Sequence, residues 1–412
     1  MTTATQPAGP ACATDRSAHG RGFWLLAATF MTLMAFTTVP TPIYHYYQER
    51  DGFPTFVITL IFAAYGIGVM VGLYFAGHLS DVHGRRRMLA AAIGLTIISA
   101  AVFVLSQDTP ALLVARLISG LAIGVLTPTA TAALGELAAA HRPDRSPAFA
   151  STVATVVNTG GLALGPLIGG LLVTFLPDPM IIPYAVFLAL AILTTAALWA
   201  TPETVNPVAP QDRPAYRPQQ VALLPEGRAS FRAAALSAGA AFSVLGFFTS
   251  LTGTFVGRVL GYGAPLVTGS IVFGVLGMSA LVQVLLSGLD QRTRLITGVV
   301  AIIAGLALVA VAALVRNLPL FVIAGLAAGA GVGLIFQASV ATAVRFSRPE
   351  ARGGTLAGLF LAAYVGITLP VIAVGVVATW WSIPTVLVVF AALVAVVIAA
   401  CAPVMLRSAR PA

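Results

Sequence analysis

Long apolar segments alternate with short polar ones along the whole chain of 412 residues. Each apolar segment holds about 20 residues, which is the length that an α-helix needs to cross the hydrocarbon core of a bilayer. The pattern predicts twelve spans, near residues 22–43, 55–77, 89–107, 111–137, 148–175, 181–200, 233–256, 265–288, 296–315, 319–343, 353–377 and 382–405. We therefore expect an all-α polytopic membrane protein.

The composition excludes several other classes of protein. Hydrophobic residues make up 58% of the chain and charged residues 8%, whereas an ordinary soluble domain carries about 25% charge. The net charge is +9, but the basic residues are all arginines in short separated clusters, so we expect membrane lipid and not nucleic acid as a partner. The five histidines lie in the tail, in loops or at span ends, and Cys12 and Cys401 are far apart. We expect no disulfide, metal or cofactor.

The distribution of the 22 arginines tests the span map, because the map rests on apolarity alone. Eighteen arginines fall in alternate loops and at the two chain ends, while Arg50, Arg258 and Arg316 fall in the opposite set. Arg116 lies inside a span. Loops rich in arginine stay in the cytoplasm, so we expect both termini to be cytoplasmic. We expect the protein to lie in the cell (plasma) membrane. The polar start of the chain lacks the pattern of a secretory signal, so the first span is expected to be retained.

The longest hydrophilic stretch, Pro202 to Arg232, divides the spans six and six, and its composition is that of a linker without its own core. The expected parts are a tail over 1–21, a six-helix bundle over 22–200, a linker over 201–232, a second bundle over 233–405 and a tail over 406–412. Weak internal similarity relates the halves. The loop GLDQRTRL with Asp290 repeats the pattern of the loop after the second span, and Pro370 matches Pro166. Two related bundles are typical of alternating-access transporters.

The sequence GHLSDVHGRRRML, at 77–89, is a short arginine-rich turn between the second and third spans. It is similar to the loop signature of the major facilitator superfamily, whose positions are filled here by Gly77, Asp81, Gly84, Arg85 and Arg86. The resemblance covers essentially the whole chain. It implies a charge network that includes Glu136 of the fourth span and holds the inward gate shut. The alternative is that these charges only set the topology and contact lipid headgroups.

Two further stretches resemble motifs of the same family. The fourth span carries one of them at Arg116, Gly120 and Gly124. The fifth span contains GLALGPLIGG, similar to a motif associated with exporting, proton-exchanging branches, at Gly161, Gly165, Pro166, Gly169 and Gly170. Small residues there let a neighbouring helix approach closely and Pro166 permits a kink, so the stretch is either an antiport hinge or a close-packing face. Arg116 either snorkels to the outer interface or faces the central cavity.

The resemblance implies a secondary transporter that works by alternating access, with its cavity between the halves. The polar residues expected to line this cavity are the binding candidates: Thr37, Thr38, Thr127, Asn158, Thr249, Ser250, Thr252, Gln337 and Tyr364. Each hydroxyl alternatively bonds its own helix backbone. Hydroxyls, amides, apolar walls and one arginine suit a neutral or weakly anionic amphipathic molecule.

Export of a drug-like compound or metabolite in exchange for protons is the leading interpretation, and we expect a monomer. The middle of each predicted span lacks a carboxylate, so proton coupling stays open, with Asp81, Glu136, His45 and His78 as titratable candidates. Uptake by symport or facilitated carriage of a small neutral solute is the alternative. A membrane-embedded enzyme is a distant third, because the sequence shows no nucleophile with a base at membrane depth.

Overall fold

The computed structural model describes residues 11–77, 79–143, 148–205, 208, 210–212, 221–348 and 352–409, and its regular structure in this part of the chain is helical. The long helices are α1 (Ala11–Thr38), α3 (Thr55–Ala76), α5 (Arg85–Leu105), α6 (Thr109–His141), α7 (Ala148–Phe175), α8 (Ile182–Trp199), α9 (Arg228–Arg258), α10 (Pro265–Leu285), α11 (Gln291–Val315), α12 (Leu318–Arg345), α13 (Arg352–Val377) and α14 (Ile383–Ser408). Two short helices, α2 (Tyr44–Asp51) and α4 (Ser80–His83), lie between them. Residues 1–10 and 410–412 of the predicted tails, and 213–220 of the predicted linker, lie outside the described residues.

Eleven of these helices are long and apolar enough to cross a membrane. They match the predicted spans to within a few residues, and α7 has the predicted bounds of 148–175. The twelfth long helix, α1, is less apolar because it contains Arg16, Arg21 and several threonines. It nevertheless packs among the others through a row of buried side chains that includes Leu26, Phe30 and Leu33. The prediction of an all-α polytopic fold is therefore confirmed.

The first predicted span, 22–43, has the wrong ends. The helix α1 begins at Ala11, inside the predicted tail, and ends at Thr38. It ends there because Pro40 and Pro42 have no backbone N–H to continue the hydrogen-bond ladder, and the chain restarts as α2. The predicted linker is also too long at its end, because α9 begins at Arg228.

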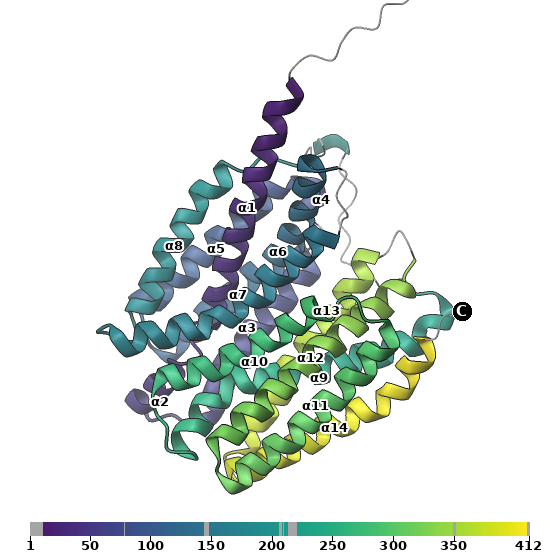
Figure 1. Cartoon of the computed structure of the whole chain (residues 1–412). Coiled ribbons are helices and arrows are strands. Elements are labelled where there is room, and N and C mark those ends of the chain that lie inside the picture. The colour runs from purple at the N-terminus through teal and green to yellow at the C-terminus, as the bar shows by residue number, and fades with distance from the viewer. Residues whose placement is uncertain are drawn as a thin grey trace, which may run out of the picture.

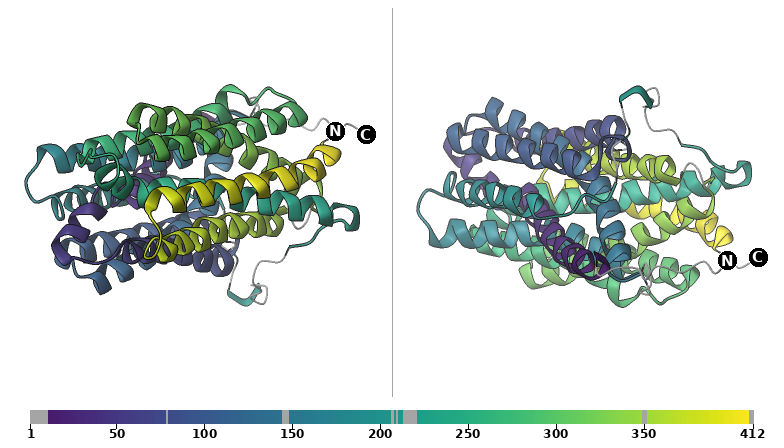
Figure 2. Two further views of the ribbon diagram at one scale, coloured as in Figure 1. Left: turned by 90° about the horizontal axis from the view of Figure 1, so that it is seen from below. Right: turned by 90° about the horizontal axis from the view of Figure 1, so that it is seen from above.

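The long helices form two bundles that lie side by side, with α1 to α8 in one and α9 to α14 in the other (Figure 1). The first half has an apolar core of its own, around Phe30, Ile123 and Leu134. The second half is built around Phe248, Phe255 and Phe321. In both views of Figure 2 the helices run along one common direction. We call the end of the molecule that holds α4 the motif end, and the end that holds α2 the far end.

Contacts between the halves gather at mid-height and at the far end. Helix α3 meets α13 where Gly66 faces the Thr368 hydroxyl and Gly375 faces Thr59. Helix α7 meets α10, where a Cβ added to Gly170 would lie 2.9 Å from the Pro265 carbonyl oxygen. Such close approaches require glycine, because any side chain would separate the helices. The two bundles are thus joined through small residues on two helix pairs.

Candidate functional site

The arginine-rich loop at the motif end is organised around Arg85. Gly84, just before it, has φ of +91°, a conformation that residues with a Cβ rarely adopt, and it turns the chain sharply from α4 into α5. The Arg85 side chain is 11% exposed. Its Nη2 donates to Glu136 Oε1 on α6 at 2.8 Å, and its Nη1 donates to Ser80 Oγ at 2.6 Å and to Asp81 Oδ1 at 2.6 Å. One guanidinium therefore ties α4 and α6 to the start of α5.

The structure brings Asp81, Arg85 and Glu136 together, as the sequence motif implies, but gives them unequal places. Asp81 is at the edge, with its side chain 65% exposed, whereas Arg85 lies at the centre. Arg86 points elsewhere, because its Nη2 donates to the Trp199 carbonyl oxygen at 3.0 Å and its guanidinium lies 4.3 Å from the centre of the Trp199 ring. Gly77 closes α3 with an ordinary helical φ of −59°. His78, named above as titratable, lies outside the described residues.

Two linker residues complete the network, and sequence reasoning missed both. The Glu203 carboxylate accepts the backbone N–H groups of Arg85 and Arg86, both at 3.0 Å, and so caps the first turn of α5. The Thr204 hydroxyl donates to Glu136 Oε2. A carboxylate at a helix N-terminus satisfies free donors and interacts favourably with the helix dipole. Because Glu203 comes from the segment that leads to the second half, the linker is fastened to the arginine-rich loop.

We expect Glu203→Gln to destabilise the loop by about 1 kcal/mol, the usual cost of weakening a helix N-cap. The amide keeps one acceptor oxygen but loses the second acceptor and the negative charge. The readout is the thermal unfolding midpoint in detergent, compared with Glu226→Gln, which changes an exposed carboxylate at the other end of the linker. Equal midpoints for the two variants would remove Glu203 from the network.

The equivalent loop of the second half is built differently. Asp290 caps α11 itself, accepting from the Thr293 N–H at 3.0 Å, and the hydrogen bonds from Thr293 lower the pKa of the Asp290 carboxyl. Arg294 donates to the backbone carbonyls of Ser287 and Leu289. The first half instead supplies its cap from the linker. The two loops therefore share a pattern of residues, but their charged side chains make different contacts.

Arg116 is buried inside the first bundle, only 2% exposed. Its Nη1 donates to the Thr37 carbonyl oxygen at 2.6 Å, and its guanidinium lies 4.5 Å from the centre of the Tyr65 ring. That carbonyl is free to accept because Pro40 has no N–H and the Thr41 N–H bonds to Thr38. The guanidinium thus turns inward, which is not the geometry of snorkelling to an interface. Its Nε has no hydrogen-bond partner among the described residues.

We expect Arg116→Gln to weaken binding of the small molecule expected from the sequence at least tenfold, because a buried guanidinium with a free donor offers a charge-assisted hydrogen bond worth about 1.5–3 kcal/mol. The amide can keep one bond to Thr37 but carries no charge. Binding is measured by titrating the compound into purified protein. Arg316→Gln, at an exposed helix end, is the control, and unchanged binding in Arg116→Gln would leave that arginine a purely structural role.

The glycines of the fourth-span motif hold α6 against α3. A Cβ added to Gly124 would lie 2.6 Å from the Leu73 N, and one on Gly120 would overlap the Tyr65 carbonyl oxygen. Across the contact, Gly72 and Gly68 on α3 are equally tight against α6. On each helix the two glycines are four residues apart, the spacing that lets two helix backbones approach closely. The partner pair on α3 was not singled out from the sequence, although GVMVG carries the same spacing.

The fifth-span motif presents two faces. Gly161 and Gly165 lie against α1, where an added Cβ at Gly161 would lie 2.7 Å from the Met31 carbonyl oxygen, and Gly169 lies against Val39 just after α1. Gly170 and the Pro166 backbone instead meet α10, where Gly269 faces the Pro166 carbonyl. Both alternatives raised from the sequence thus keep a physical basis. The stretch is a close-packing face, and it also forms part of the junction between the halves.

The cavity candidates separate into two groups. The first group is engaged with its own helix or with a neighbour. Thr249 and Ser250 donate to backbone carbonyls one turn earlier in α9, and Thr38 donates to Leu162 of α7 at 2.8 Å. Thr37 donates to the Met34 carbonyl, while its own carbonyl holds Arg116. These hydroxyls position helices.

The second group comprises the remaining candidates, three of which have a buried polar atom without a partner in the described part of the chain. The Thr127 and Thr252 hydroxyls and the Gln337 Oε1 are buried with no hydrogen-bond partner among the described residues. Gln337 donates through Nε2 to the Gln283 carbonyl oxygen at 3.2 Å. Asn158 is half-buried on α7, and Tyr364 of α13 meets Tyr65 of α3 with ring centres 6.5 Å apart. Tyr364 and Tyr65 therefore connect the surroundings of Arg116 to the second half.

Comparison with known proteins agrees with this architecture. Residues 24–315 match the family model of the Major Facilitator Superfamily. A 70-residue stretch is 46% identical to the arabinose-proton symporter of Bacillus subtilis (strain 168), covering 17% of this chain and 15% of that protein. A 129-residue stretch is 25% identical to the quinolone resistance protein NorA of Staphylococcus aureus, covering 31% of this chain and 32% of that protein. These matches span less than a third of either relative.

A solved structure extends the likeness to nearly the whole chain. The nucleoside transporter NupG, solved as a point mutant, superposes with a TM-score of 0.71 at 13% identity, covering 93% of this chain and 99% of that one. At this identity the likeness concerns the fold. The family match over most of the chain, the two bundles of spanning helices and the arginine-rich loop lead to one conclusion: this chain is a multi-pass membrane protein that belongs to the major facilitator superfamily.

Proposed function

We propose that the protein exports an amphipathic small molecule in exchange for protons, by alternating access between its two halves. The observation that carries this proposal is the double face of α7. Its Gly161 and Gly165 lie against α1, and its Pro166 and Gly170 lie against α10 of the other half. A junction made of backbone and small residues lets two bundles change their angle without unlocking interdigitated side chains.

The orientation and location belong to the same proposal. We place the motif end on the cytoplasmic side of the plasma membrane, because eighteen of the 22 arginines fall in the set of predicted loops and chain ends to which the arginine-rich loop belongs. The contacts between halves at the far end, such as Gly170 with Pro265, then support an inward-facing arrangement. The formed Arg85 network does not oppose this, because it joins α4, α5 and α6 of the first half and not the two halves. In that arrangement the molecule to be exported would enter from the cytoplasm.

The class of substrate follows from the side chains where the halves meet. Aromatic rings continue from Tyr65 to Tyr364, with Phe242 6.1 Å from Tyr364 and Phe336 4.9 Å from Phe242. Tyr364, Phe242 and Phe336 are half-buried. Rings with exposed area offer an apolar, stackable surface, while Arg116 and the free oxygen of Gln337 offer polar contacts. A neutral or weakly anionic molecule with an apolar body fits both.

Proton exchange needs a titratable group whose exposure changes during the cycle. Glu136 is engaged with Arg85 and Thr204 in this arrangement, so it would become available when the loop rearranges. At the far end, His45 Nε2 lies 3.0 Å from the Glu49 carboxylate, beside Gly257 of α9. These two groups, at opposite ends of the molecule, are our candidates for proton carriers.

The second candidate function is proton-driven uptake of a small neutral solute. It is favoured by the 46% identity to the arabinose-proton symporter, which is the highest identity among the relatives named above but covers 70 residues. The similarity to NorA is lower in identity and longer in extent. We favour export because the fifth-span motif resembles one that is associated with exporting branches of the family.

The test is substrate-driven proton movement in liposomes that contain the purified protein and an internal pH dye. A pH gradient is imposed and a panel of lipophilic compounds and simple sugars is added in turn. We expect dye recovery with a lipophilic compound, and loss of that recovery in Glu136→Gln. Transport of the compound without proton movement would refute antiport, and proton movement with a sugar in the uptake direction would favour the second candidate.

A further inference from the structure

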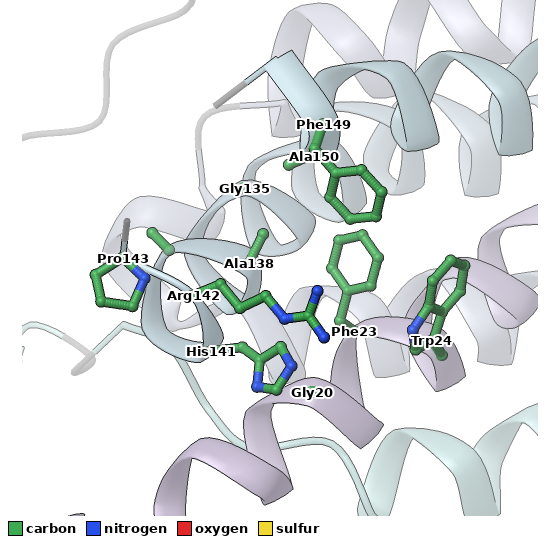
Figure 3. Close-up of a pocket in the computed structure, with 11 residues that line it drawn as sticks. Gly20, Phe23, Trp24, Gly135, Ala138, His141, Arg142, Pro143, Phe149 and Ala150 are labelled. Carbon is green, nitrogen blue, oxygen red and sulfur yellow. The ribbon is translucent and has the colours of Figure 1, made fainter. Parts of the chain in front are cut away.

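A cavity of about 460 Å³ lies in the first half at the motif end, away from the junction between the halves. It is enclosed by the first part of α1, the last part of α6 and the beginning of α7 (Figure 3). None of the proposed transport residues lines it. A volume of this size holds a drug-sized molecule or the headgroup and part of a chain of a lipid.

One side of the cavity is aromatic. The Phe23 and Phe149 rings are stacked with centres 5.8 Å apart, and the Trp24 ring stands on edge against Phe23 at 5.2 Å. Phe23 is buried, but Trp24 is 60% exposed and Phe149 is 40% exposed. Large apolar side chains with that exposure at the end of spanning helices face the lipid. The aromatic side is therefore open to an acyl chain.

The other side of the cavity is cationic. Arg142, just after α6, extends toward Phe23 beside the His141 ring (Figure 3). A His141 ring nitrogen lies 2.7 Å from the Arg16 carbonyl oxygen, and Gly20 leaves room for that ring, since a Cβ there would lie 2.7 Å from its Cε1. Among the described residues that line the cavity there is no carboxylate. Arg142 thus gives this side of the cavity a positive charge that attracts an anion.

We propose that this cavity binds an anionic phospholipid, with the headgroup phosphate on Arg142 and an acyl chain along Trp24 and Phe149. The combination of a guanidinium and an apolar wall at the end of a bundle matches a molecule with a charged head and an apolar tail. A zwitterionic lipid is attracted less strongly, because the cation in its own headgroup is repelled by the Arg142 guanidinium. The proposal is independent of the transported substrate and of its coupling.

The test uses quenching of Trp24 by brominated lipids in the whole chain. Replacement of Trp199, Trp380 and Trp381 by phenylalanine leaves Trp24 as the single reporter. The protein is reconstituted in phosphatidylcholine vesicles that contain increasing amounts of either dibromo-phosphatidylglycerol or dibromo-phosphatidylcholine. We expect phosphatidylglycerol to quench at about fivefold lower mole fraction, the ratio that one interfacial arginine contributes.

Two variants separate binding from general effects on the fold. Arg142→Gln is expected to abolish the fivefold preference, while Arg292→Gln, an exposed arginine in the second half, keeps it. Gly135→Leu fills the cavity, because nothing lies within 4 Å of a Cβ at Gly135, and is expected to weaken quenching by both lipids; Gly94→Leu, which also has open space, is its control. Equal quenching by the two lipids in the parent, or an unchanged preference in Arg142→Gln, would overturn the proposal. So would inorganic phosphate at millimolar concentration relieving the quenching, because the anion bound would then not be a lipid.

Discussion

Replacing Arg85 by glutamine is expected to lower the rate of transport by about ten- to hundredfold while folded protein still reaches the membrane. The guanidinium makes charge-assisted bonds to Glu136 and Asp81 and a further bond to Ser80. Loss of a hydrogen bond between charged groups costs about 1.5–3 kcal/mol, and that amount corresponds to the stated factor in a conformational equilibrium. The helices α4 and α6 would then no longer be held to the start of α5.

The matched control is Arg87→Gln, two residues along the same helix, where the side chain is exposed. It removes one positive charge from the same loop, so it reproduces any effect on topology or on lipid headgroups. Transport is measured as initial uptake into liposomes at equal amounts of folded protein. If Arg85→Gln and Arg87→Gln lower the rate of transport equally, the loop acts only through its charge, and the network has no conformational role.

Replacing Gly165 by alanine is expected to lower the thermal unfolding midpoint and to abolish most transport. A Cβ at Gly165 would overlap the Ala35 carbonyl oxygen and the Thr38 hydroxyl on α1. The two helices would have to separate, and overpacking of this kind costs about 1–3 kcal/mol. The direction of this change in stability is informative, because alanine in place of glycine normally stabilises a helix by about 1 kcal/mol.

Gly160→Ala is the control for that substitution, since it lies on the same helix and nothing is within 4 Å of an added Cβ. Its unfolding midpoint should be equal to that of the parent or higher. Unfolding is followed by loss of monodisperse protein in detergent on heating, together with transport in liposomes. Full activity of Gly165→Ala would mean that α1 and α7 are not held at this distance in the working protein.

The fold was predictable because bilayer thickness imposes one length on every span. Apolarity alone located the helices to within a few residues from α3 onward. Apolarity did not predict the end of α1, because hydropathy carries no information on where a helix stops. Pro40 and Pro42 stop α1 at Thr38, even though the residues after it are still apolar enough to continue a span.

The candidate site was predictable only where a motif fixes both residue and spacing. The loop motif led to Asp81, Arg85 and Glu136, and the structure places both carboxylates within hydrogen-bond reach of the Arg85 guanidinium. Glu203 could not be found in this way, because its role depends on the N-terminus of α5 lying beside the linker. Its one sequence signal is a carboxylate directly after the apolar run of α8.

The cavity residues show a different limit. A threonine in a spanning helix has the same sequence signature whether its hydroxyl bonds the preceding turn, as Thr249 does, or stays free, as Thr127 does. The difference lies in the rotamer, which neighbouring helices decide. Arg116 is a similar case, because its inward direction depends on the Thr37 carbonyl that Pro40 leaves free.

The central claim is that the two halves rock so that one end closes as the other opens. We would measure it by electron spin resonance distances between spin-label pairs, with Cys12 and Cys401 replaced. One pair, at Arg87 and Gly353, reports on the motif end, and the other, at Asp108 and Trp380, reports on the far end; all four positions are exposed. On addition of the transported compound or a change of pH, we predict that the motif-end distance shortens while the far-end distance lengthens. Distances that stay fixed, or that change in the same direction at both ends, would contradict alternating access.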